Sequence, residues 1–136
     1  MERKKILVAD DDHDNFILAM DALKEAGLDC DLCWVKDGEE LLDYLYHRIP
    51  YEDPLQAPAP DLILLDLNMP KKTGHEALKE IKADSELAGI PVVVLTVSNA
   101  KEDMERSYAL GASAFVRKPY NFERLVDSMR ELKKYL

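Results

Sequence analysis

The sequence predicts a single α/β domain in which five helices cover both faces of a five-stranded parallel sheet. Short, almost wholly apolar segments alternate five times with longer segments whose apolar residues recur every three or four positions. The short segments lack the alternation of a half-exposed strand, as is typical of parallel strands buried on both faces. Strands that alternate with helices form right-handed βαβ units, so all the strands should run in the same direction.

The composition fits one domain spanning residues 1–136 and excludes several classes of protein. Hydrophobic residues make up 47% and charged residues 33% of the chain, which is typical of a globular domain with a real core. The net charge of −9 argues against nucleic-acid binding through general basicity. No apolar segment approaches the roughly 18 residues that cross a membrane, and the N-terminus lacks a secretion signal. We therefore expect a cytoplasmic protein that binds neither membranes nor nucleic acid.

The first half of the chain carries two strand–helix pairs. The first strand, 5–9, ends at three aspartates, and the amphipathic helix that begins near Asp14 is closed by Gly27. The second strand, about 30–35, is followed by Asp37, a typical helix N-cap with a glutamate three residues later. A leucine-rich helix follows this cap.

Two features of this half require interpretation. Cys30 and Cys33 form a C-x-x-C spacing, but residues three apart in a strand point to opposite faces, and no second pair completes a zinc site. We interpret them as packing residues. The segment of about 47–60 holds four of the seven prolines and no apolar period, and it is longer than a usual helix-to-strand link. We interpret it as a surface insertion.

The second half repeats the strand–helix pattern. A third strand, 61–66, places Asp66 at its C-terminal end, and Thr73 then begins a capping box and a third helix. A β-branched fourth strand, 91–96, is followed by a helix that we expect Asn99 to cap and that ends near Gly111.

The last strand–helix pair closes the domain. A short fifth strand covers 114–118, and Asn121 caps the final helix. The apolar residues that we expect to face inward on this helix are Phe122, Leu125, Val126, Met129 and Leu132. Five strands of this size favour the flavodoxin-like order 2-1-3-4-5.

Polar side chains lie at the carboxyl ends of these strands, where ligands of such sheets bind. They are Asp10 and Asp11 after strand 1, Asp66 after strand 3, Thr96 on strand 4 and Lys118 on strand 5. Three carboxylates in one cleft repel one another unless a cation lies among them, and oxygen ligands without a Cys or His cluster suit Mg²⁺. The hydroxyl and the ammonium group can contact an anionic group opposite the metal. This set favours phosphoryl transfer, a reaction in which an aspartate can act as the nucleophile and form an acyl phosphate.

These residues resemble those of a receiver domain, the phospho-accepting module of two-component response regulators, over the whole chain. The matching segments are Ala9-Asp10-Asp11, Leu65-Asp66-Leu67-Asn68-Met69-Pro70, Leu95-Thr96 and Phe115-Val116-Arg117-Lys118-Pro119. The 47–60 loop and the segment 68–74 make the chain similar to single-domain regulators associated with bacterial phytochromes.

The resemblance implies a role for each matching residue. Asp66 would be phosphorylated by a histidine kinase, of which a phytochrome-type kinase is one candidate, or by a phosphotransfer protein. Asp10, Asp11, Asp66 and the backbone carbonyl of Asn68 would hold Mg²⁺, and Lys118 would pair with the phosphoryl group.

The resemblance also implies a conformational switch. Thr96 and Phe115 would form the switch pair, and the bond before Pro119 would be cis. Phe115 stands where tyrosine is common in the family, and Val97 stands where a small residue is common. The surface of strands 4–5 and helices 4–5 would then bind a downstream protein or a second copy of the chain.

The predicted function is therefore a stand-alone response regulator that catalyses only its own phosphorylation and slow dephosphorylation and is not otherwise an enzyme. One alternative is an interaction module that keeps the fold and works without phosphorylation. A Mg²⁺-dependent phosphatase is a further alternative, although Asn68 cannot serve as the general acid of aspartate-nucleophile phosphatases.

Overall fold

Five parallel strands form one sheet in the order β2-β1-β3-β4-β5 in the computed structural model, which describes residues 3–118 and 121–136. The strands are β1 (Lys4–Ala9), β2 (Cys30–Val35), β3 (Leu62–Leu65), β4 (Val92–Thr96) and β5 (Ala114–Arg117). Every neighbouring pair in this sheet is parallel. The predicted strand order is confirmed.

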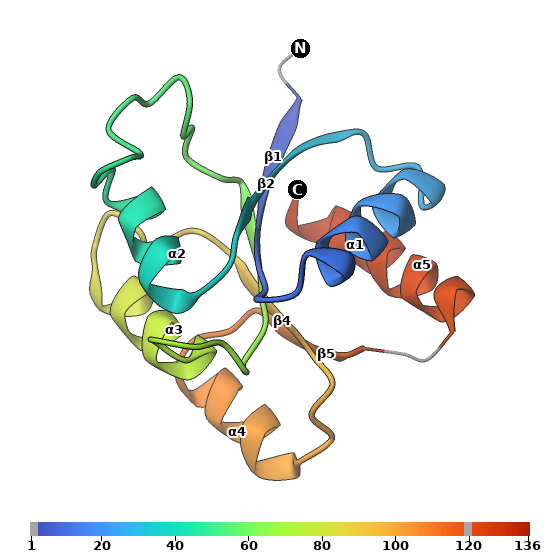
Figure 1. Ribbon diagram of the computed structural model, residues 1–136. Coiled ribbons are helices and arrows are strands. Elements are labelled where there is room, and N and C mark those ends of the chain that lie inside the picture. Colours follow the sequence, from blue (N-terminus) through green and yellow to red (C-terminus); the bar gives the residue numbers. More distant parts are fainter. Residues whose placement is uncertain (1–2, 119–120) are drawn as a thin grey trace.

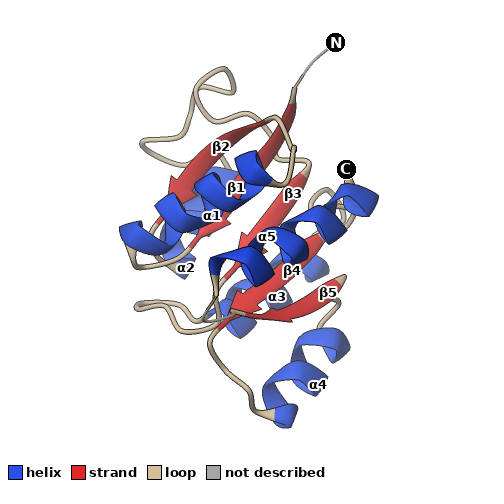
Figure 2. Ribbon diagram, turned by 90° about the vertical axis from the view of Figure 1, so that its right-hand side faces the viewer, coloured by secondary structure: helices blue, strands red, loops and turns tan. Residues whose placement is uncertain are grey.

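Helices cover both faces of the sheet. They are α1 (His13–Glu25), α2 (Gly38–Leu45), α3 (Gly74–Ala83), α4 (Lys101–Ala109) and α5 (Phe122–Glu131), followed by the short 3₁₀ helix η1 (Leu132–Tyr135). Helices α1 and α5 lie on one face, whereas α2, α3 and α4 lie on the other (Figure 1, Figure 2). Across the described ranges, no helix combines the length and apolar character that a membrane span requires.

The side chains of the strands form part of two separate apolar cores, one on each face of the sheet. On β3, Ile63 and Leu65 pack in the core beneath α2 and α3, whereas Leu62 and Leu64 pack in the core beneath α1 and α5. All four side chains are at most 2% exposed. Because side chains alternate along a strand, a strand buried on both faces must be apolar at every position. This explains the unbroken apolar runs in the sequence.

The two cysteines follow the same alternation along β2. Cys33 packs against the core beneath α2 and α3, and Cys30 packs against the core beneath α1 and α5. Both thiols are free, and the Cys33 sulfur lies 3.5 Å from the Tyr44 hydroxyl oxygen. Their interpretation as packing residues is confirmed.

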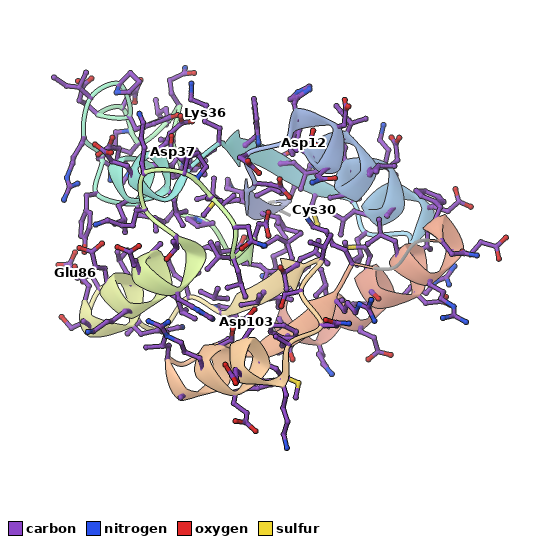
Figure 3. All side chains as sticks on the ribbon, turned by 60° about the horizontal axis from the view of Figure 1, so that its bottom comes forward. Asp12, Cys30, Lys36, Asp37, Glu86 and Asp103 are labelled. Atoms are coloured by element: carbon purple, nitrogen blue, oxygen red, sulfur yellow. The ribbon has the colours of Figure 1, made fainter. Side chains whose placement is uncertain are left out.

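Side chains cap most of the helix starts as predicted. Asp37 accepts a hydrogen bond from the Glu40 N–H (2.7 Å), Thr73 and Glu76 form a complete capping box, and Asn121 accepts from Arg124 N–H. Figure 3 labels Asp12 and Asp37 at the starts of α1 and α2.

Two predictions about helices were wrong. The N-cap of α4 is Ala100 and not Asn99, and it makes no side-chain cap bond, because alanine has no polar side-chain atom. The Ala100 N–H itself donates to the Ser98 hydroxyl at 3.2 Å. Phe122 is 41% exposed and does not face inward. A helical side chain leans toward the preceding turn, and Phe122, as the first residue of α5, has no such turn to cover.

The 47–60 loop packs against α2 near both of its ends. The Tyr44 hydroxyl donates to the Pro58 carbonyl, and the His47 Nε2 lies 2.9 Å from the carbonyl of Ala57, which is fully buried. Between these contacts Ile49 and Leu55 are 79% and 88% exposed. The Ile49–Pro50 peptide bond is cis. The loop is therefore anchored at its base and exposed in its middle, and its interpretation as an insertion stays a prediction.

Candidate functional site

Three carboxylates meet where β1 and β3 end. Asp10 and Asp66 each follow their strand by one residue, and the main-chain ladder still continues there. The Asp10 N–H donates to Val35 O (3.1 Å), and the Asp66 N–H donates to Ala9 O (2.9 Å). Asp10 and Asp66 are consequently buried next to each other, and their carboxylate oxygens lie within 4.8 Å of one another and of a carboxylate oxygen of the exposed Asp11.

Lys118 brings a positive charge to this cluster from the end of β5. Its Nζ donates to Asp10 Oδ2 at 2.6 Å and lies 3.7 Å from Asp66 Oδ2. The Lys118 N–H donates to the Thr96 carbonyl, which fixes the backbone of the lysine against the end of β4. The ammonium group therefore bridges the carboxylates that follow β1 and β3.

The environment of Asp66 disfavours a bare negative charge. Burial raises the pKa of its carboxyl, the Lys118 ammonium lowers the pKa, and the Asp10 carboxylate raises it again. The Asn68 N–H, 3.4 Å from Asp66 Oδ1, also lowers the pKa, and the net direction is upward. A further cation beside these oxygens would remove the repulsion.

The donor set fits a hard divalent cation. All three candidate ligands are carboxylates, as Mg²⁺ and Ca²⁺ prefer, and the exposed Asp11 leaves one side open for the waters that Mg²⁺ usually retains. The next predicted ligand, Asn68, lies between the buried side chains of Leu67 and Met69. Its own side chain is exposed, and only its main chain is proposed as a ligand.

The predicted switch residues lie on the neighbouring strands. Thr96 is fully buried, and its Oγ1 accepts a hydrogen bond from the Ser98 N–H at 3.3 Å. Phe115 is half-buried against the core beneath α2 and α3, and its N–H donates to the Tyr108 hydroxyl. The predicted cis bond before Pro119 lies outside the described residues.

Comparison with protein families matches residues 6–130 to the response regulator receiver domain. The chain belongs to the response regulator receiver family. Among curated proteins it is similar to the probable methanogenesis regulatory protein FilR2 of Methanothrix harundinacea, with 37% identity over 96% of this chain and 81% of that protein. It is also similar to the response regulator Rcp1 of Synechocystis, with 36% identity over 97% of this chain and 88% of Rcp1.

Solved structures support the same assignment for the receiver. The phosphorylated cyanobacterial phytochrome response regulator RcpA superposes with a TM-score of 0.88 at 36% identity, covering 98% of this chain and 94% of RcpA. The Mn²⁺-bound form of Rcp1 superposes with a TM-score of 0.85 at 37% identity, covering 96% of this chain and 92% of that structure.

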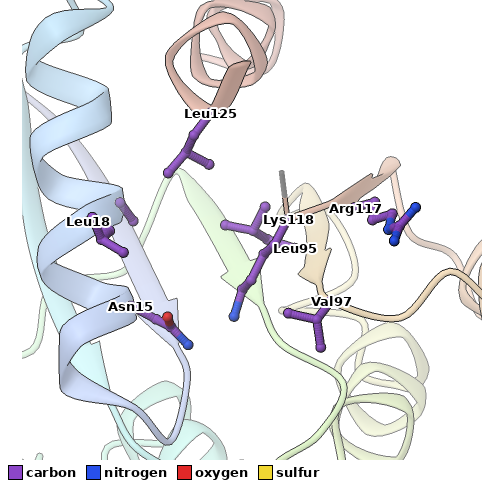
Figure 4. A pocket seen from close by; sticks show the side chains of 8 residues that line it. Asn15, Leu18, Leu95, Val97, Arg117, Lys118 and Leu125 are labelled. Atoms are coloured by element: carbon purple, nitrogen blue, oxygen red, sulfur yellow. The ribbon is translucent and has the colours of Figure 1, made fainter. Parts of the chain in front are cut away.

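An apolar cleft of about 190 Å³ opens beside the carboxylates of the receiver. Figure 4 shows Leu18 of α1 and Leu125 of α5 on one side, and Val97 and Lys118 at the strand ends on the other. Leu18 is 47% and Val97 is 64% exposed. Val97 thus forms part of the wall of this cleft.

One contact of the site was not foreseen from the sequence. Trp34 Nε1–H donates to the Asp10 carbonyl at 2.8 Å, so the indole holds the main chain of a candidate metal ligand from the edge strand β2. The only available signal was a tryptophan near the end of a strand adjacent to β1, and this signal is not specific.

Proposed function

We propose that this receiver is a stand-alone response regulator that accepts a phosphoryl group on Asp66. The donor is the phosphohistidine of a histidine kinase or of a phosphotransfer protein. The observation that carries this proposal is the juxtaposition of Asp66 with Asp10, Asp11 and the Lys118 ammonium at one edge of the sheet. Two similar solved structures, a phosphorylated RcpA and a Mn²⁺-bound Rcp1, are consistent with it.

In the proposed reaction, a carboxylate oxygen of Asp66 attacks phosphorus in line with the leaving imidazole nitrogen. The oxygen–phosphorus bond forms as the nitrogen–phosphorus bond to the histidine breaks. Lys118 then exchanges part of its interaction with Asp10 for the phosphoryl oxygens, which supplies charge compensation in a largely buried site. Phosphoryl transfer needs mainly such positioning and neutralisation.

The metal ligands in this proposal are the carboxylates of Asp10, Asp11 and Asp66 and the carbonyl of Asn68. Bound Mg²⁺ would neutralise the repulsion between these carboxylates and the incoming phosphoryl oxygens. The Asp10 carboxylate is held in a fixed orientation for this role, because its Oδ1 accepts hydrogen bonds from Asp12 N–H (2.9 Å) and Asn15 Nδ2 (3.3 Å).

The apolar cleft beside Lys118 gives the donor protein a place to dock in this proposal. A partner that covers Leu18 and Val97 would remove exposed apolar surface and would bring a histidine close to Asp66. A phytochrome-type kinase is one candidate donor, since the similar structures RcpA and RtBRR are named as a phytochrome and a bacteriophytochrome response regulator.

The output in this proposal is a change in the surface formed by β4, β5, α4 and α5. Thr96 would leave the Ser98 N–H and bond the phosphoryl group, and the Phe115 ring would turn inward behind it. The two states would differ in their affinity for a downstream protein or for a second copy of the chain.

The direct test is phosphoryl transfer from a labelled histidine kinase in the presence of Mg²⁺. We expect label on the wild-type protein, none after chelation of the metal and none on Asp66→Asn. Asp53→Asn is the matched control, because Asp53 is an exposed aspartate in the 47–60 loop. Equal labelling of Asp66→Asn and wild type would refute the assignment. If neither the kinase nor beryllofluoride with Mg²⁺ changes the protein, the phosphorylation-independent module is favoured.

A further inference from the structure

The loop between β3 and α3 carries the proposed main-chain ligand and is fixed at its beginning. Leu67 and Met69 are 5% and 6% exposed, and both side chains lie in the core beneath α2 and α3. The Gly74 N–H donates to the Leu67 carbonyl at 3.0 Å, which closes the loop where α3 begins. Asn68 is therefore held between two buried side chains, but residues 70–73 need a further support.

That support is the first residue of α2. A Cβ atom placed on Gly38 would lie 2.2 Å from the Lys72 carbonyl oxygen and 2.8 Å from the Lys72 carbonyl carbon. Both are backbone atoms, so neither can move aside without moving the loop. Lys71, next to this contact, has a positive φ of 65°, and its Nζ lies 3.9 Å from Asp37 Oδ2. The loop thus rests directly against the start of α2.

The start of α2 is itself a rigid surface. Asp37 is 3% exposed and caps the helix through the Glu40 N–H, and Leu41 and Leu42 are buried in the core. The Glu40 carboxylate also accepts a hydrogen bond from the Tyr51 hydroxyl of the 47–60 loop at 2.9 Å. Contacts on three sides therefore hold the turn that touches Lys72.

We propose that Gly38 is a positioning residue for metal binding. Because it has no side chain, the first turn of α2 contacts the Lys72 backbone directly, and this contact fixes the position of the Asn68 carbonyl. A side chain at position 38 would push the loop away from α2 and shift that carbonyl relative to Asp10 and Asp66. The inference rests on the proposed function, because it assigns a role toward the proposed metal site.

The test compares Gly38→Ala with Gly89→Ala by calorimetric titration of the metal-free proteins with Mg²⁺. Gly89 is exposed, and a Cβ there would meet nothing within 4 Å. We expect Gly38→Ala to bind Mg²⁺ about tenfold more weakly, as is typical when a group that orients a metal ligand is disturbed. Gly89→Ala should match the wild type. Folded Gly38→Ala with wild-type affinity would overturn the inference.

Two further measurements separate the possible failures. If the wild type binds no Mg²⁺, the proposed function fails at its metal site. If the wild type and Gly38→Ala bind Mg²⁺ equally, only the role of Gly38 is refuted. A purely structural role would lower the unfolding free energy without metal and leave the affinity of the folded protein unchanged. If Gly38→Ala does not fold, amide exchange in metal-free wild type decides. The Lys72 N–H, which donates to the Pro70 carbonyl at 2.7 Å in the turn that Gly38 contacts, should be protected before Mg²⁺ is added. Exchange of this N–H as fast as in an unfolded chain would refute a loop fixed by α2.

Discussion

Asp66 occupies a position that is unfavourable for its own charge. It is 6% exposed, it lies beside Asp10 and Asp11, and the net effect of these surroundings is a raised pKa. The folded protein thus binds a proton at Asp66 more tightly than the unfolded chain does. Above the folded pKa, the ionised carboxylate subtracts from stability. This is the pattern of a group kept for function at a cost to stability.

We expect Asp66→Asn to stabilise the metal-free protein at pH 7. The substitution removes the charge that burial disfavours and keeps the shape of the side chain, so the gain should be on the order of 1 kcal/mol. Urea unfolding in the presence of a chelator measures it. Asp53→Asn, at an exposed site, should leave the midpoint unchanged. A lower midpoint for Asp66→Asn would show that its pairing with Lys118 outweighs the repulsion.

His75 gives the fold a dependence on pH. The ring is 8% exposed, and its Nε2 lies 2.9 Å from the Ser107 hydroxyl, which itself donates to the Asp103 carbonyl. Burial lowers the pKa of His75, the Arg106 guanidinium lowers it further, and interactions with Asp103 act in the opposite direction. The folded protein therefore keeps the neutral ring at a pH where the unfolded chain is already protonated.

The stability that His75 contributes should be complete above the pKa of a free histidine, about 6.5. It should be lost as the pH falls from there through the lower folded pKa. We expect His75→Gln, which keeps a donor toward Ser107, to lose less unfolding free energy than wild type between pH 7.5 and pH 5.5. Parallel denaturation curves for the two proteins over this range would contradict the prediction.

The residues of the site differ in how well a sequence reveals them. Asp10, Asp66, Thr96 and Lys118 were predictable because each is polar at the end of an apolar strand, and parallel strands bring such ends to one edge. Gly38 was not predictable in its contact with Lys72, because the closeness of two backbones depends on tertiary packing. The hydrogen bond of Trp34 escaped prediction for the same reason.

Among the elements, α4 is the helix with the weakest attachment. Only Ser107 is buried on it, and its N-cap makes no side-chain hydrogen bond. Ser98, just before the helix, bonds a side chain of its first turn: the Ser98 hydroxyl donates to Asp103 Oδ2 at 2.5 Å, and the Ser98 N–H donates to Thr96 Oγ1. Ser98 therefore ties the first turn of α4 to the proposed switch residue. In the proposed switch, a helix held in this way would respond when Thr96 moves.

We expect Ser98→Ala to loosen the start of α4. The loss of a capping interaction costs about 1 kcal/mol locally, so amide exchange in the first turns of α4 should become about fivefold faster or more. Hydrogen exchange read by mass spectrometry resolves this helix from the others. Ser128→Ala, which removes a serine hydroxyl from α5, is the control and should leave α4 unchanged. Unchanged exchange in α4 of Ser98→Ala would mean that its backbone alone holds the helix.

The helix ends also show how far local sequence patterns can be trusted. Asp37, Thr73 and Asn121 cap their helices as predicted, because each is followed at once by a helical turn whose N–H groups need acceptors. Asn99 has the same chemistry but lies one residue before the cap of α4. Before this helix Ser98 bonds the Ala100 N–H, the Asp103 carboxylate and Thr96, contacts that depend on the tertiary fold.

For the molecule as a whole, the sheet is both the source of stability and the support of the site. Topology was predictable because strands that are apolar at every position require cover on both faces, and only a few arrangements of five βα units provide it. The packing of the 47–60 loop was not predictable, since it depends on contacts such as the hydrogen bond between the Tyr51 hydroxyl and the Glu40 carboxylate. Single contacts of this kind leave no periodic pattern in a sequence.

Because Asp10 and Asp66 follow the adjacent strands β1 and β3 of the sheet, metal bound there should stabilise the entire domain. An ion that binds only the folded state raises the unfolding free energy by about 2.7 kcal/mol at 100 times its Kd. We expect the urea midpoint of the wild type to rise with Mg²⁺ concentration in this manner. Asp11→Asn removes an exposed ligand without disturbing the core, so its midpoint should respond only at much higher Mg²⁺. Na⁺ at equal ionic strength controls for screening of the net charge of −9. If Na⁺ and Mg²⁺ stabilise the wild type equally, the carboxylates bind no specific cation.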